Sequence, residues 1–171
     1  MKKAVAGFSL KALDKSFGAM VTGVQLADID ASVFEQLHQA WLKYALLIFP
    51  GQHLTDAEQT VFARRFGDLV PGLEAAEISN VKRDGSLRDA PDDDMMKVIR
   101  GNMNWHQDNT YMPLQAKGAV FSAKVVPKEQ GDTGFADMRA AWDALEENTR
   151  ETIADLSAYH SLVHSQKVLG L

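Results

Sequence analysis

The sequence predicts an α+β fold built on an antiparallel sheet or barrel, for three reasons. Short apolar stretches bounded by turn residues recur along the chain, as at 19–26 and 45–49, and they indicate strands. Few stretches have the three- and four-residue apolar spacing of an amphipathic helix, and 32–44 is the clearest. Strands and helices do not alternate regularly, which disfavours a doubly wound parallel sheet. We expect residues 1–171 to form a single domain, because this length is enough for one core.

The composition excludes several classes of function. A net charge of −5 gives no basic surface for nucleic acid. The chain has no cysteine, which excludes disulfides, thiolate metal sites and a cysteine nucleophile. No apolar run approaches the roughly 20 residues of a membrane-spanning helix, and the stretch after Met1 is too short for a signal peptide. We therefore expect a cytoplasmic protein with neither nucleic acid nor membrane as a partner.

The N-terminal part is expected to hold three strands and the clearest helix. A first strand is predicted at 4–10, and a second at 19–26, where Gly23 interrupts it. Apolar residues at helical spacing follow, so 32–44 is predicted to be an amphipathic helix. The continuous apolar run at 45–49 ends at a Pro-Gly turn and is predicted to be a buried strand.

A second helix is predicted to begin with a capping box. Thr55 and Glu58 have the required spacing, in which each side chain bonds the backbone N–H of the other residue. The helix is expected to run to about Phe66, with Gly67 after its end. Its inner face should carry three apolar residues, namely Val61, Phe62 and Phe66.

The remainder of the chain is predicted to contain a long polar loop, several strands and two short helices. The loop covers 68–95, and its acidic part before the next strand would suit a mobile lid. The expected strands are 78–82 within that loop, 97–101, a β-rich stretch at 116–126, and 132–137. Helices are expected at 138–145 and 149–156.

The stretch from Asn102 to Asp108 holds the residues best suited to catalysis. His106 and Asp108 are two residues apart, so on an extended backbone both side chains point to the same face. Such a pair makes up two of the three ligands of the 2-His-1-carboxylate triad that binds Fe(II). The bare His-x-Asp pattern is common, however, and is weak evidence by itself.

The other histidines support different interpretations. His38, within a helix, is expected to be a surface or boundary residue, and His53, in a turn, is expected to be structural rather than pocket-lining. His160 and His164 are four residues apart, and on a helix that spacing could chelate a metal. With His106 they could form the zinc site of a hydrolase, but the spacing supplies no general base.

Beyond this motif, separate blocks of sequence carry a family resemblance in the same order. The sequence resembles the taurine dioxygenase and chlorophenoxyacetate dioxygenase family at residues 49–55, 62–67 and 104–111, and at Pro113, Ala119, Lys124, Pro127 and 131–133. Members of that family are Fe(II)- and 2-oxoglutarate-dependent oxygenases. The resemblance implies a double-stranded β-helix, or jelly roll, with flanking helices.

The resemblance also implies roles for individual residues. His106 and Asp108 correspond to iron ligands, and the hydroxyl of Thr133 corresponds to a group that hydrogen-bonds a carboxylate of 2-oxoglutarate. Asn102 corresponds to a position that contacts substrate. Tyr111 is expected either to border the same cavity or to be a packed aromatic. Trp105 alternates with His106 and is expected to support the core.

The chain departs from the family pattern towards its end. The family's second histidine ligand and its arginine for 2-oxoglutarate lie further along and are not in this chain; His160, His164, Arg139 and Arg150 do not match them. We therefore expect the chain to be an N-terminal portion, with a jelly roll that lacks its C-terminal strands.

Two functions remain open. The first is hydroxylation of a small organic acid (a sulfonate, sulfate ester or aryloxyalkanoate) by O2, with release of succinate and CO2. The second is that of a truncated, non-catalytic fragment or binding module of the same fold. Association into a homo-oligomer is also left open.

Overall fold

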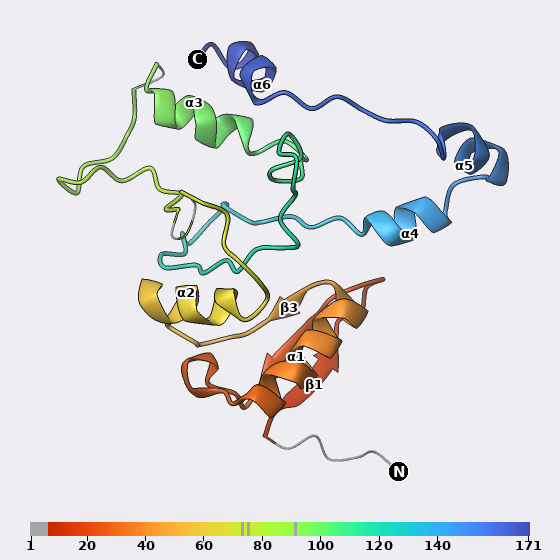
Figure 1. Cartoon of the computed structure of the whole chain (residues 1–171). Helices are drawn as coiled ribbons and strands as arrows, with labels where there is room; N and C mark the ends of the chain where they lie inside the picture. The colour runs from red at the N-terminus through yellow and green to blue at the C-terminus, as the bar shows by residue number, and fades with distance from the viewer. Residues whose placement is uncertain (1–6, 73, 75, 91) are drawn as a thin grey trace. The chain divides into compact units, whose positions relative to one another are not determined.

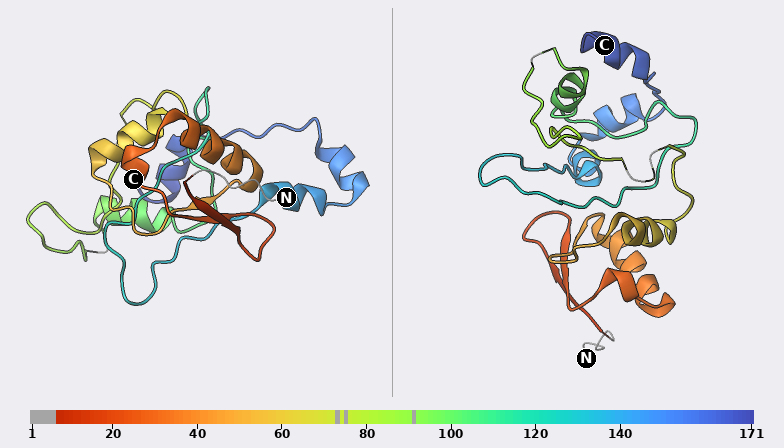
Figure 2. Two further views of the ribbon diagram at one scale, coloured as in Figure 1. Left: turned by 90° about the horizontal axis from the view of Figure 1, so that it is seen from below. Right: turned by 90° about the vertical axis from the view of Figure 1, so that its left-hand side faces the viewer.

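The computed structural model describes residues 7–72, 74, 76–90 and 92–171. These residues form two compact units (Figures 1 and 2), each built from two separate segments of the chain. The first unit contains residues 7–69 and 120–155, and the second contains 70–119 and 156–171. Across these described ranges, no helix is both long enough and apolar enough to span a membrane.

A three-stranded sheet lies in the first unit, in the order β1-β2-β3. Strand β1 (Ser9–Ala12) pairs antiparallel with β2 (Ala19–Thr22), and β2 pairs parallel with β3 (Leu47–Ile48). The predicted antiparallel sheet is therefore wrong in its third strand, because a helix between β2 and β3 allows a parallel return.

Two of the predicted strand boundaries also differ. Strand β1 begins at Ser9 and continues through Lys11, which the sequence pattern placed beyond the strand; residues 4–6 of that prediction lie outside the described residues. Strand β2 ends at Thr22, because Gly23 adopts φ +78° and turns the chain. The short 3-10 helix η1 (Leu26–Asp28) then follows.

Helix α1 (Ala31–Tyr44) confirms the helix predicted at 32–44. The Asp30 carboxylate caps its start by accepting a 2.8 Å hydrogen bond from the Val33 N–H. Ala45 caps the end of the helix: it adopts φ 60° and donates its N–H to the Trp41 carbonyl. Leu37 lies on the inner face and is 1% exposed.

Helix α2 (Asp56–Arg64) begins with the predicted capping box, and both of its hydrogen bonds are present. The inner face is only partly as predicted. Phe62 is buried and Phe66 packs against the core, but Val61 is 63% exposed. The helix ends at Arg64, two residues before the expected end, because the chain passes into a turn at Arg65.

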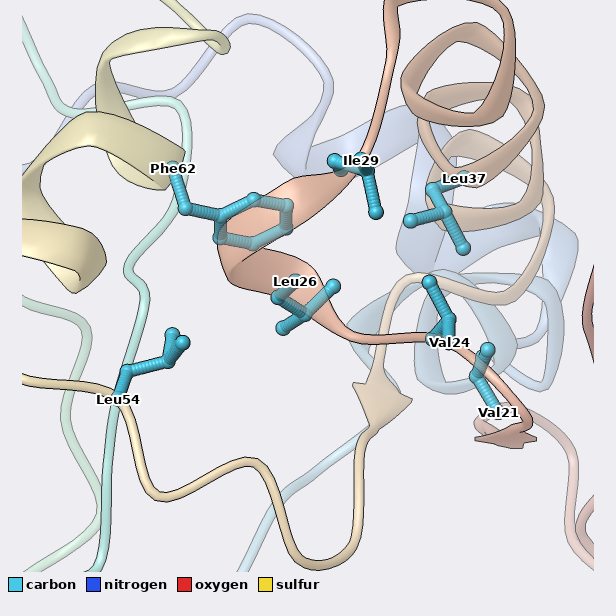
Figure 3. Close-up of a cluster of buried hydrophobic side chains, with 7 residues drawn as sticks. All are labelled: Val21, Val24, Leu26, Ile29, Leu37, Leu54 and Phe62. Atoms are coloured by element: carbon cyan, nitrogen blue, oxygen red, sulfur yellow. The ribbon is translucent and has the colours of Figure 1, made fainter.

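The core of the first unit gathers apolar side chains from the sheet, η1, α1 and α2 (Figure 3). Its buried residues include Val21, Val24, Leu26, Ile29, Leu37, Leu54 and Phe62. An aromatic group extends this core, since Phe34 and Phe62 each pack edge-to-face against Phe66. His38 is half-buried and stacks on Phe34 with 5.9 Å between ring centroids, which confirms its predicted place at the boundary of the core.

Two polar side chains join the elements around this core. Gln52 accepts a 2.8 Å hydrogen bond from the Leu26 N–H and donates to the Val24 carbonyl at 3.0 Å. Its side-chain amide thus satisfies two backbone groups that follow strand β2, as a neighbouring strand would. Arg65 donates to the Ile29 carbonyl at 2.7 Å and to the Asp30 carbonyl at 3.0 Å. Arg65 thereby attaches the end of α2 to the start of α1.

The second segment of the first unit forms helices but no strand. The strands predicted at 116–126 and 132–137 are wrong, since both ranges are irregular. Phe121, Val125 and Val126 remain exposed because no neighbouring strand pairs with them in the described structure. The two helices predicted next are confirmed in shorter form as α4 (Met138–Asp143) and α5 (Glu147–Ile153).

The second unit is built around α3 (Asp94–Gly101), which lies beside α6 (Leu162–Val168) in Figures 1 and 2. The strand predicted at 97–101 is wrong, because the Asp93 carboxylate accepts from the Met96 N–H and starts a helix. The strand predicted at 78–82 is also wrong; it is reduced to a single bridge between Val81 and Leu87.

Candidate metal centre

Helix α3 leads directly into the stretch that carries the candidate ligands. Asn102 ends the helix and donates its N–H to the Val98 carbonyl at 3.0 Å. Turn-type bonds follow, from the Met103 N–H to the Arg100 carbonyl at 3.2 Å and from the Asn104 N–H to Gly101 at 3.3 Å. The motif is therefore a turn that continues from a helix, and it does not have the extended backbone for which the sequence pattern predicts that His106 and Asp108 converge.

The two candidate ligands nevertheless converge as predicted. His106 Nε2 lies 3.3 Å from Asp108 Oδ1, and the side chains are 44% and 77% exposed. The other ring nitrogen of His106, Nδ1, lies 2.6 Å from the Asn104 carbonyl oxygen. A carbonyl can only accept, so Nδ1 must carry a proton. In the neutral ring that carries this proton, Nε2 has the lone pair that a metal would need.

This geometry fits a divalent cation. Two ligand atoms that each lie about 2.1 Å from one ion stand about 3.0 Å apart at a right angle. The 3.3 Å between His106 Nε2 and Asp108 Oδ1 is close to that value. Both atoms are electron-pair donors in the neutral-imidazole state, and a cation between them would bind both. The chain's own residues therefore fit two positions of a metal site.

Among the described residues, no third protein ligand joins this pair. Within the part of the chain that the structure describes, no group of three His, Cys, Asp or Glu side chains is arranged to hold a metal. His160 and His164 do not form the helical pair that their spacing allows, because α6 begins at Leu162 after its N-cap Ser161. His160 therefore precedes the helix. The spacing of four residues does not place the His160 and His164 side chains on one helical face.

The remaining predicted site residues lie in different places. Asn102 and Tyr111 are exposed and belong to the second unit, as do His106 and Asp108. Thr133 is exposed in an irregular segment of the first unit, just after a turn in which Gln130 and Gly131 have positive φ.

One prediction about the motif is wrong. Trp105 was expected to support the core, but it is 75% exposed. The alternation that placed Trp105 opposite His106 and inside applies to a strand, and this backbone turns instead.

Two features of the site could not be read from residue types alone. The Asn104 carbonyl that binds His106 is a backbone group, and every residue carries one. The start of α3 is held by a 3.0 Å ion pair between Arg88 and Asp93. The N–H of Met96 and the Arg88 guanidinium lower the pKa of Asp93, although partial desolvation opposes them. The sequence did contain one signal for this helix start: Asp93 is an N-cap residue type that stands just before apolar residues.

Comparison with known proteins finds relatives that are named as dioxygenases. The profile of the taurine catabolism dioxygenase TauD, TfdA family matches residues 9–168. The (S)-phenoxypropionate/alpha-ketoglutarate-dioxygenase of Sphingobium herbicidovorans is 59% identical over 164 residues, which cover 95% of this chain and 56% of that protein. The alpha-ketoglutarate-dependent 2,4-dichlorophenoxyacetate dioxygenase of Cupriavidus pinatubonensis is 32% identical over 170 residues, covering 90% of this chain and 58% of that protein.

A solved structure is also similar. AAD-2, crystallised in complex with Mn(II) and N-oxalylglycine, matches with a TM-score of 0.88 at 36% identity. The match covers 96% of this chain and 59% of that chain. This chain thus spans about half the length of the curated relatives that it matches.

Proposed function

The chain belongs to the taurine catabolism dioxygenase TauD, TfdA family, and we propose that it serves the Fe(II)- and 2-oxoglutarate-dependent oxidation of a small organic acid by O2. The observation that carries this proposal is the His106–Asp108 pair, whose facing atoms are 3.3 Å apart. Its spacing and its donor types suit a divalent metal.

His106 and Asp108 would hold the iron, through Nε2 and Oδ1 respectively. The third ligand is proposed to be a histidine outside this chain. When bound, iron and 2-oxoglutarate supply the oxidation of an unactivated C–H bond, with succinate and CO2 as co-products. The protein's part is to fix the ligands and to orient the two organic molecules.

Thr133 is proposed to bind one carboxylate of 2-oxoglutarate. Its exposed hydroxyl can donate a hydrogen bond to an anion without adding a charge. The preceding turn at Gln130 and Gly131 sets the backbone that presents it. Loss of the hydroxyl in Thr133→Val would then raise the KM for 2-oxoglutarate while leaving the metal affinity unchanged.

An aryloxyalkanoate is the substrate class that we propose first. The relative at 59% identity is named for phenoxypropionate, and those at 38% and 32% for 2,4-dichlorophenoxyacetate. Sulfate esters and sulfonates are the other candidates, after relatives of lower identity. Asn102 and Tyr111 are proposed to contact this substrate, since both are exposed near the metal pair in the sequence.

We further propose that the fold is a single domain, residues 1–171, of the double-stranded β-helix type, completed by strands outside this chain. The high similarity to AAD-2 over 96% of this chain supports this. The order of the segments along the chain also supports one domain. Segment 70–119 of the second unit lies between the two segments of the first, and segment 120–155 of the first lies between the two segments of the second. The cytoplasmic location and the absence of nucleic-acid and membrane partners stay predictions.

Binding of Mn(II) to the chain tests the metal site directly. The chain has five histidines, and each gives its own imidazole signal in NMR. Paramagnetic broadening is expected first at His106 and should be lost in Asp108→Ala, which keeps the His106 signal; in His106→Ala no other histidine should broaden at the same Mn(II) concentration. His160→Ala is the matched control, because it removes an exposed histidine of the same unit. Equal broadening at His106 and His160 in the wild type would refute the site.

Succinate formation with an aryloxypropionate tests the reaction. The assay needs a protein that contains this chain and also supplies the third metal ligand. Turnover is expected from that protein and should be lost when His106→Ala or Asp108→Ala is introduced into it. Sustained, substrate-dependent turnover in either variant would refute the ligand assignment, whichever substrate is used.

A second candidate function is that of a non-catalytic module of the same fold. It is favoured by one observation, namely that the described residues bring together no group of three metal ligands. Under this hypothesis the 171-residue chain folds but forms no succinate under any supply of Fe(II) and 2-oxoglutarate. Succinate formation by the chain alone would exclude it.

A further inference from the structure

We propose that Asn104 is a positioning residue for the metal ligand His106. It connects the end of α3 to the imidazole and holds the ring in the tautomer that can bind a metal. This inference rests on the proposed metal site, but its first consequence concerns the metal-free chain and can be tested separately.

The first step is the hydrogen bond to the ring. The Asn104 carbonyl oxygen lies 2.6 Å from His106 Nδ1, which is a short separation for such a bond. Because the carbonyl is an acceptor, it selects the ring form with the proton on Nδ1. The Asp108 carboxylate, which faces Nε2 at 3.3 Å, is also an acceptor and favours the opposite tautomer, so the shorter bond to Asn104 is what favours a lone pair on Nε2 in the neutral ring.

The second step is what holds that carbonyl in place. Asn104 is attached to the Gly101 carbonyl twice, by its backbone N–H at 3.3 Å and by its side-chain amide Nδ2 at 3.4 Å. A side chain that bonds a carbonyl three residues earlier limits rotation of its own backbone unit. The amide of Asn104 thus acts on His106 through the orientation of the Asn104 peptide group.

The third step is that Gly101 is itself fixed. Helix α6 packs so closely there that a Cβ on Gly101 would lie 2.5 Å from Leu169 Cδ1. Lys97 also donates to the Gly170 carbonyl at 3.1 Å, so a second contact holds α6 against α3. The carbonyl that anchors Asn104 therefore belongs to a packed helix end, and it can serve as a firm reference point for the ring.

Three variants test this inference. Asn104→Ala removes the side-chain bond to Gly101, whereas Asn104→Ser keeps a donor that can reach a carbonyl three residues earlier. Gln107→Ala is the matched control, because it removes an exposed amide between the two ligands. Amide NMR spectra of each variant establish that the fold is retained before the other measurements.

Two readouts are required, at one fixed pH. The ¹⁵N chemical shifts of His106 in the metal-free chain give the fraction of ring with the proton on Nδ1. Titration with Mn(II) alone gives the dissociation constant. If only that tautomer binds, the constant rises as the inverse of its fraction. We expect Asn104→Ala to lower the fraction and to weaken Mn(II) binding about three- to tenfold.

The outcomes separate this inference from the proposed function. Recovery of both readouts in Asn104→Ser, with no change in Gln107→Ala, supports the positioning role. An unchanged tautomer fraction in Asn104→Ala overturns it, even if Mn(II) binding weakens. If the wild type binds no Mn(II), the proposed metal site fails, while the tautomer fractions still decide whether Asn104 positions the ring.

Discussion

Replacing Leu37 by alanine should strongly destabilise the first unit. Leu37 is 1% exposed, so nearly the whole side chain is lost from the core. Three carbon groups at about 0.8 kcal/mol each give about 2.4 kcal/mol of lost transfer free energy. The cavity left beside Ile29 and Val24 (Figure 3) raises the expected cost to about 3–4 kcal/mol.

Leu42→Ala is the matched control, because it makes the same change on the same helix at a side chain that is 54% exposed. It should cost less than about 1 kcal/mol. Urea unfolding followed by circular dichroism measures both variants. With a slope of about 2 kcal/mol per molar urea, Leu37→Ala should lower the midpoint by about 1.5–2 M. Equal midpoints for the two variants would refute the assignment of the core.

Three further perturbations probe the capping and joining side chains. Hydrogen bonds from the Thr55 N–H and hydroxyl lower the pKa of Glu58 below its ordinary value of 4.5. The pKa of Glu58 is lower in the folded than in the unfolded chain, so its stabilisation is present above about pH 4.5 and is lost as the pH falls through the folded value. Urea unfolding should therefore find Glu58→Gln less stable than the wild type at pH 7, with the difference shrinking on acidification; a constant difference contradicts this. Arg65→Ala should cost about 1–2 kcal/mol, since two hydrogen bonds to backbone carbonyls are lost at an exposed site. Its exposed neighbour gives the control Arg64→Ala, and equal thermal midpoints would contradict the role of Arg65. Gln52→Ala should cost about 1–3 kcal/mol, because it leaves the N–H of buried Leu26 without its acceptor. Hydrogen exchange should quicken at that amide, and unchanged protection there would contradict the assignment.

Local signals predicted the parts of the fold that depend on neighbouring residues. Helix α1 follows from its apolar spacing, and the capping box of α2 follows from Thr55 and Glu58 alone. The convergence of His106 and Asp108 was also predicted, although for a strand. The pair converges on a turn because the imidazole is held by the carbonyl of Asn104, two residues before it.

Signals that depend on distant partners misled the prediction. Phe121, Val125 and Val126 have strand-like composition, but a strand needs a neighbour to accept its hydrogen bonds. The stretch Lys97–Gly101 holds the β-branched pair Val98 and Ile99, which favours a strand, but the N-cap at Asp93 starts a helix there. The role of Thr133 and the identity of the third metal ligand depend on contacts that no local pattern records.

The chain crosses between the two units three times, at residues 69–70, 119–120 and 155–156. A protease that cut at one of these crossings would therefore not release a unit. After a cut at 69–70, Gln59 still donates to the Val120 carbonyl at 3.0 Å, and Lys124 still donates to Leu54 at 2.5 Å. The two pieces would separate on a denaturing gel yet migrate together on a native column. Neither unit could be expressed alone as one continuous stretch of the gene.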